Sequence, residues 1–197
     1  MISRFIVDVL NEESIDELTE WLKANNYIMK GMAYTVGKAV TLPYQAMKSR
    51  DFSDLFTLNA SAFAILFTHL YNSEFFNRDD ASVVVISSIV SQVGARGKIG
   101  YSTSKGSLNA IVRSLALEVA SKKIRVNAIS PGTVYTEMLD RLINTIGTEG
   151  IEKLKDEYPL GIGYPEDIAD LAYFLLTPAS RWMSGNIITI DGGYSAR

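Results

Sequence analysis

The stretch ASVVVISSIVSQVGARGKIGYSTSKGSLNAIVRSLALEVASKKIRVNAIS (residues 81–130) holds the strongest secondary-structure pattern in the chain. An apolar, β-branched run over Ala81–Ser88 predicts a buried strand, and Ile124–Ser130 predicts a second strand that Pro131 stops. Between them, Tyr101–Lys122 carries apolar residues at helical spacing. Strands that alternate with a helix predict a parallel sheet covered on both faces.

The same alternation continues on both sides of this stretch. Further strands are predicted at Arg4–Leu10, Tyr27–Met32 and Asn186–Gly193. Further helices are predicted over residues 11–26, Asp54–Phe76, Thr136–Thr145 and Pro165–Leu176, with a loop at Val36–Met47. With 197 residues and no visible linker, the chain is expected to form one α/β domain over residues 1–197.

Composition excludes several classes of protein. The chain is 47% hydrophobic with a net charge of −3, and it has neither a basic block nor an acidic tail, so no nucleic-acid partner is expected. It has no cysteine and a single histidine, His69, so disulfides, thiolate chemistry and a zinc site are not expected. Without a signal sequence or a long apolar run, no membrane span is predicted and a cytoplasmic protein is the expectation.

The spacing of Tyr101 and Lys105 suggests chemistry. Residues four apart lie on one face of a helix. A phenol has a pKa near ~10, and a neighbouring ammonium lowers it, so the pair could serve as a general acid or base. Ser88 ends the strongest strand, at the edge where open parallel sheets bind ligands. A chance meeting of a surface tyrosine and lysine is the alternative interpretation of the pair.

Three motifs together resemble the short-chain dehydrogenase/reductase family. They are the Ser88–Tyr101–Lys105 spacing, the SPG after the next strand, and the ending PEDIA…SGNIITIDGGY. The resemblance extends from about Arg4 to Tyr194 and is closest to the branch that resembles 3-oxoacyl-acyl-carrier-protein reductases. It implies a Rossmann-like parallel sheet with helices on both faces.

The resemblance also implies roles for individual residues. Tyr101 would be the proton donor to a carbonyl, and Ser88 would orient and polarise that carbonyl. Lys105 would lower the pKa of the tyrosine and bond the nicotinamide ribose. Asn59 would support a proton relay through water. The alternative for Asn59 is a helix-interior asparagine bonded to nearby backbone.

Two groups of residues would contact the cofactor, NAD or NADP, if the resemblance holds. The first group packs on the nicotinamide and bonds its carboxamide: Pro131, Gly132, Val134 and Thr136. The second group touches the adenine: Asp8 and Val9. Asp8 has an alternative role as a helix cap at the end of a strand.

The sequence departs from the family at its N-terminus. Family members begin with a strand, a glycine-rich turn and a helix that binds the pyrophosphate. This sequence lacks that unit, so an N-terminally truncated fold with weak or partial cofactor binding is expected. Arg4–Leu10 would then be the third strand of the family order. It is predicted to pair in parallel with Tyr27–Met32, in a sheet of about five strands.

The expected function is an NAD(P)-dependent oxidoreductase that reduces a small carbonyl compound, a 3-oxoacyl group among them, to an alcohol. The alternative is a non-catalytic truncated member that acts as a binding or scaffolding subunit. A homodimer or homotetramer is expected, because the predicted helix Asp54–Phe76 is apolar on most sides and the helix from Tyr101 carries extra apolar residues. His69 is expected to be packed or interfacial.

Overall fold

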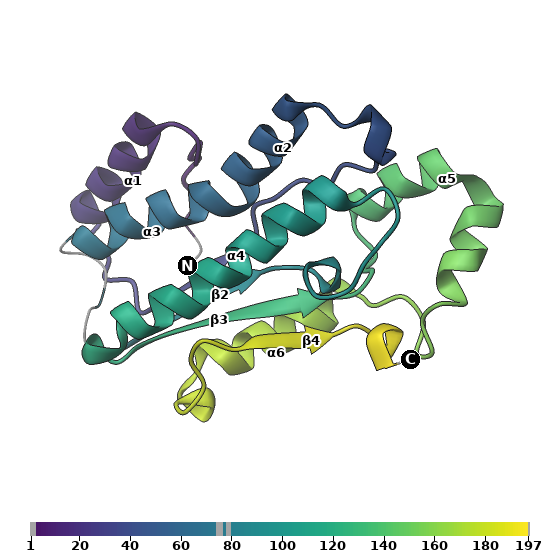
Figure 1. Ribbon diagram of the computed structural model, residues 1–197. Coiled ribbons are helices and arrows are strands. Elements are labelled where there is room, and N and C mark those ends of the chain that lie inside the picture. The colour runs from purple at the N-terminus through teal and green to yellow at the C-terminus, as the bar shows by residue number, and fades with distance from the viewer. Residues whose placement is uncertain (1–2, 74–76, 78–79, 197) are drawn as a thin grey trace.

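The computed structural model describes residues 3–73, 77 and 80–196, and their order of elements alternates strands with helices (Figure 1). The elements are α1 (Glu12–Ala24), β1 (Gly31–Tyr34), α2 (Ser49–Phe56), a π-helical turn at Thr57–Ser61, α3 (Ala62–Asn72), β2 (Ala81–Ile86), α4 (Ile99–Glu118), β3 (Ile124–Pro131), α5 (Glu137–Lys155), α6 (Pro165–Leu176) and β4 (Ile187–Ile190). The α/β fold predicted from the sequence is therefore confirmed.

The sheet of the described residues has four strands in the order β1-β2-β3-β4, and every neighbouring pair is parallel. Because the strands are parallel, their carboxyl ends meet at one edge of the sheet. The segments that begin after Tyr34, Ile86, Pro131 and Ile190 therefore share that edge.

Helices cover both faces of the sheet, as Figure 1 shows, with α1, α2, α3 and α4 on one side and α6 on the other. On the side of α3 and α4, Val83 and Val85 join Phe63 and Leu108 in the main core. On the other side, Val84 packs with Leu175 of α6. Alternate residues of β2 thus face opposite layers, as the period of a strand requires.

The predicted strand at Arg4–Leu10 is wrong, and so is the five-stranded sheet that depended on it. Residues 3–8 have no regular structure, and residues 3–7 make no backbone hydrogen bond to the rest of the described chain. Side chains hold this segment instead: the ring of Phe5 lies 5.4 Å from that of Trp21, and Ser3 Oγ lies 2.9 Å from Tyr27 Oη. A β-branched run favours extended backbone, but only a ladder partner makes it a strand.

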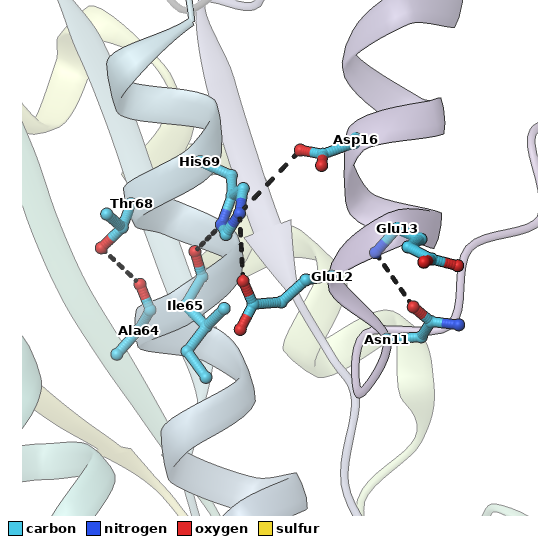
Figure 2. Close-up of polar contacts among 8 residues, drawn as sticks. All are labelled: Asn11, Glu12, Glu13, Asp16, Ala64, Ile65, Thr68 and His69. Atoms are coloured by element: carbon cyan, nitrogen blue, oxygen red, sulfur yellow. Dashed lines mark hydrogen bonds and ion pairs between the residues drawn. The ribbon is translucent and has the colours of Figure 1, made fainter.

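The packing of α1 on α3 places His69 between two carboxylates (Figure 2). Its Nδ1 lies 3.0 Å from the Ile65 carbonyl, and its Nε2 lies 3.9 Å from Glu12 and 4.0 Å from Asp16. The prediction for His69 is a packed or interfacial position; within the chain it is half-buried against α1, and an interfacial role stays a prediction. The predicted helix ran to Phe76, which lies outside the described residues, whereas α3 ends at Asn72.

Helix α5 forms an arm at the carboxyl edge of the sheet, and we call Glu137–Lys155 the lid. It is longer than the predicted Thr136–Thr145 because it continues past a kink at Gly147, where φ is +71°. The segments before and after the lid meet at its base, where Val134 bridges Gly163. Among the described residues, no helix is both long and apolar enough to cross a membrane.

Candidate functional site

Ser88 lies just beyond β2 and is fixed by a tight turn. Its carbonyl accepts hydrogen bonds from Ser91 N at 3.0 Å and Ser91 Oγ at 2.5 Å. Asn109 of α4 donates to the same Ser91 hydroxyl at 2.7 Å. The turn after β2 is therefore attached to α4, and the Ser88 side chain is held against the helix that carries Tyr101.

Tyr101 lies in the first turn of α4, and its phenol lies near enough to the Ser88 side chain for that side chain to affect its pKa. Burial raises the pKa of Tyr101, and Ser88 lowers it by less. The phenol is therefore held in its protonated form at neutral pH. A protonated phenol next to a hydroxyl can donate a proton to an oxygen bound between them.

Lys105 lies one helical turn after Tyr101 and is only 4% exposed. Its Nζ donates to the Ile86 carbonyl at 2.7 Å and lies 6.0 Å from the centre of the Tyr101 ring. Burial lowers the pKa of Lys105 to about 8. The expected lowering of the tyrosine pKa by Lys105 is not observed, because burial acts on both groups and the pKa of Tyr101 rises.

Asn59 is fully buried in the π-helical turn and bonds backbone far away in the sequence. Its Oδ1 accepts from Lys38 N at 2.8 Å, and its Nδ2 donates to the Lys38 carbonyl at 2.9 Å and to Ser104 Oγ at 2.9 Å. Asn59 does bond backbone, but that backbone belongs to a distant loop rather than to its own helix, and its role in a proton relay stays a prediction. A π-helical turn is frequent at functional sites.

Gly37 fits between Asn59 and Lys105. A Cβ at this position would lie 3.1 Å from Asn59 Oδ1 and 3.2 Å from Lys105 Nζ. The loop after β1 can therefore approach α4 closely, and any larger residue would push these two side chains. Sequence reasoning assigned no role to this loop, since its glycine lies outside any recognised motif.

The segment from Pro131 to Thr136 forms a wall at the end of β3. Thr133 N and Thr133 Oγ1 contact Tyr158 Oη at 3.0 and 2.8 Å. Gly132 N donates to the Ile190 carbonyl at 2.9 Å, and a Cβ on Gly132 would lie 2.8 Å from the Tyr158 ring. Val134 bridges Gly163, and Thr136 is the N-cap of the lid. The four predicted residues of this segment thus occupy one rigid connection.

Asp8 and Val9 lie in the turn before α1. Asp8 Oδ1 accepts from Leu10 N at 3.0 Å, and the Asp8 carbonyl accepts from Asn11 N at 3.1 Å. Val9 is buried in the main core. The helix cap itself is Asn11, which accepts from Glu13 N at 2.9 Å. No hydrogen bond or ion pair of the described residues joins Asp8 or Val9 to Ser88, Tyr101 or Lys105.

Sequence reasoning missed Lys98. Its Nζ lies 6.0 Å from the centre of the Tyr101 ring, the same distance as that of Lys105, and it donates to Thr41 Oγ1 at 2.6 Å. The signal was present in the spacing, because residues three before and four after Tyr101 share its helical stripe. The site therefore has two ammonium groups around one phenol.

Known proteins are similar to this chain over most of its length. The family model described as Enoyl-(Acyl carrier protein) reductase matches residues 3–195. The chain is 29% identical over 187 residues to the 7alpha-hydroxysteroid dehydrogenase of Escherichia coli (strain K12), covering 94% of this chain and 71% of that protein. It is 36% identical over 113 residues to the 3-oxoacyl-[acyl-carrier-protein] reductase FabG of Chlamydia pneumoniae, covering 57% of this chain and 44% of that protein.

The fold also matches solved structures. A 7 alpha-hydroxysteroid dehydrogenase complexed with NADH and 7-oxo glycochenodeoxycholic acid aligns with a TM-score of 0.83 and 26% identity, covering 95% of this chain and 72% of that one. The family match spans nearly all of the described residues, including the turn of Ser88 and the stripe of Tyr101 and Lys105. The chain belongs to the short-chain dehydrogenase/reductase family.

Proposed function

We propose that this chain is a nicotinamide-dependent oxidoreductase that interconverts a small carbonyl compound and its alcohol. The observation that carries the proposal is the placement of Ser88 and the Tyr101 phenol together at the carboxyl edge of the sheet, one helical turn from Lys105. The hydroxysteroid dehydrogenase and FabG relatives support this reaction class.

In the direction of reduction, Tyr101 donates its proton to the carbonyl oxygen, and Ser88 orients that oxygen by a hydrogen bond. The raised pKa of Tyr101 keeps the proton in place until negative charge develops on the substrate. Lys105 keeps a positive charge near the phenolate that forms. Asn59 holds the Lys38 backbone against α4 and so supports the wall of the site.

The donors around Tyr101 are suited to a nicotinamide nucleoside. Lys105 has three N–H donors, of which the Ile86 carbonyl takes one, and ribose hydroxyls accept such bonds. Pro131, Gly132, Val134 and Thr136 form the rigid wall that would face the nicotinamide. The nicotinamide supplies or accepts the hydride when it is bound. Asp8 and Val9 are proposed for the adenine end, and NAD and NADP both remain candidates.

We also propose that the chain forms at least a dimer through α3 and α4. Leu117 of α4 is 81% exposed, and Phe56 and Ile65 of the long helical segment are also exposed. Association would remove these apolar side chains from water. Light scattering at micromolar concentration should give at least twice the mass of 21.7 kDa, and a mass of one chain would refute the dimer.

The test of the proposed reaction is the Tyr101→Phe variant. The protein is incubated with NADH or NADPH and a panel of ketones, and the nicotinamide absorbance is followed. The variant should lose roughly 10²–10⁴-fold in kcat because only the proton donor is removed. Tyr173→Phe, at an exposed position on α6, is the matched control and should keep the wild-type rate. Equal rates for Tyr101→Phe and wild type would exclude this proton donor.

A further inference from the structure

Lys98 occupies an unusual position for a charged side chain. It is half-buried, it precedes α4, and its Nζ lies 6.0 Å from the centre of the Tyr101 ring. Its polar partner is the hydroxyl of Thr41, at 2.6 Å. Among the described residues, no carboxylate lies within ion-pair distance of Lys98 or Lys105.

The segments around the site carry positive charge without a matching negative charge. Residues 35–50 and 87–105, which supply the loop after β1, the turn after β2 and the first turns of α4, contain six lysines and arginines and no aspartate or glutamate. The whole chain has a net charge of −3, so the separation is local. A region with one sign of charge attracts ligands of the opposite sign.

A half-buried ammonium without a counter-charge costs free energy, and an anion placed next to it recovers that free energy. Lys105 has a backbone carbonyl as its acceptor, whereas the acceptor of Lys98 is the Thr41 hydroxyl. Lys98 also has two further N–H donors available for a carboxylate. The anion that suits Lys98 is therefore one that arrives with the molecule bound at Tyr101.

We propose that Lys98 is a specificity-determining residue that binds the carboxylate of an oxo acid whose carbonyl lies at Ser88 and Tyr101. This inference rests on the proposed function for the position of the carbonyl. Within that reaction it names the substrate class: small carbonyl compounds that carry a carboxylate a few bonds from the ketone.

Measurements of binding test this inference independently of the proposed reaction. Calorimetric titrations use pyruvate, acetoacetate and levulinate as probes, each against its methyl ester, with NAD⁺ present at a fixed concentration. At least one oxo acid should bind wild type more tightly than its ester does. Lys98→Met should weaken binding of that acid by roughly 10- to 100-fold, the range expected for one charge-assisted hydrogen bond, and leave the ester unchanged.

Two further variants complete the design. Lys98→Arg keeps the charge and should retain most of the preference for the acid. Lys122→Met removes a cation at the far end of α4 and should change neither ligand, which controls for net charge. Titration with NADH alone should give the same affinity in wild type and Lys98→Met. A loss of NADH affinity in Lys98→Met would assign the anion to the cofactor and overturn the inference.

The inference is also overturned if all three acids bind no better than their esters, or if Lys98→Met weakens acid and ester equally. These outcomes do not depend on turnover. The proposed reaction fails separately, if no ketone is reduced by wild type with either nicotinamide. A protein that binds the oxo acid through Lys98 but does not reduce it would keep the inference and refute the reaction.

Discussion

Two groups of lysines in this molecule differ in how their charge is met. In the lid, Lys153 lies 2.6 Å from Glu149 and Lys155 lies 2.8 Å from Glu152, on exposed turns of α5. At the site, Lys98 and Lys105 are partly or fully buried and have only neutral oxygens as partners. The lid lysines are matched one turn away in their own helix, whereas the site lysines are not matched within the described residues.

This difference between the lid lysines and the site lysines bears on how each group affects stability. An exposed ion pair contributes at most a fraction of a kcal/mol, so the lid pairs can be lost without consequence. A buried ammonium without a carboxylate destabilises the folded chain, and an anion bound next to it would reduce that cost. In the proposed function, an anionic or polar ligand at the site would recover this lost stability.

The largest effect on the free energy of unfolding is expected when Lys105 is replaced. The pKa of Lys105 is about 8 in the folded chain and near ~10.4 in the unfolded chain, so the unfolded chain binds more protons between these values. The free energy of unfolding should therefore rise with pH from 8 to 10, and the full penalty is present below pH 8. Lys105→Met should be more stable than wild type by about 1–3 kcal/mol at pH 7, a margin that shrinks toward pH 10.

Urea unfolding at several pH values measures this difference. Lys98 is present in both proteins, so its titration cancels in the difference between their free energies of unfolding. The measurements stop at pH 10 because the pKa of Tyr101 is raised in the folded chain, so its ionisation above that pH lowers stability. Lys153→Met is the matched lid control and should stay within about 0.5 kcal/mol of wild type. Parallel curves for wild type and Lys105→Met across this window would contradict a buried, costly ammonium.

An intermediate effect is expected at Thr41, which holds the ammonium of Lys98. Thr41→Val keeps the shape of the side chain but removes the hydroxyl 2.6 Å from Lys98 Nζ. Because Thr41 is exposed and water can replace it, a loss of about 0.5 kcal/mol is expected. Thermal unfolding at low and high salt checks this value, and a loss above about 2 kcal/mol would mean that Lys98 is structural.

The smallest effect is expected in the lid. Glu149→Gln removes the partner of Lys153 on a surface where both side chains are more than two-thirds exposed. The free energy of unfolding should fall by about 0–0.5 kcal/mol, and the change should vanish in high salt. A loss that persists in high salt would show that the lid pair is not simply solvated, and the contrast with the site would then be weaker.

The regular parts of the fold could be predicted from local sequence. Ala81–Ser88 is a run of apolar residues, and Pro165–Leu176 begins with proline and acids, so periodicity and capping identified both. Arg4–Leu10 has the same local character as a strand, yet it lacks a ladder partner. Pairing is decided by distant backbone, which local sequence does not contain.

The site was predictable to a similar degree. Spacing, strand context and the family resemblance together predicted Ser88, Tyr101 and Lys105 as a site, because a helical stripe and a strand end are local features. The partners of Asn59 could not be found this way, since its amide bonds the Lys38 backbone twenty-one residues earlier and lies in a π-helical turn. The raised pKa of Tyr101 was also missed, because burial depends on the packed structure rather than on the neighbouring lysine.

The base of the lid has a consequence for how this chain can change. Val134 bridges Gly163, and Thr133 contacts Tyr158, so the segments that lead into and out of the lid are bonded to each other. A segment whose two ends are held together can vary in length at a small cost in stability, because each doubling of its length costs only about 0.6 kcal/mol in closure entropy. Changes of sequence and length between Thr136 and Tyr158 are therefore expected to leave α4, with Tyr101 and Lys105, in place.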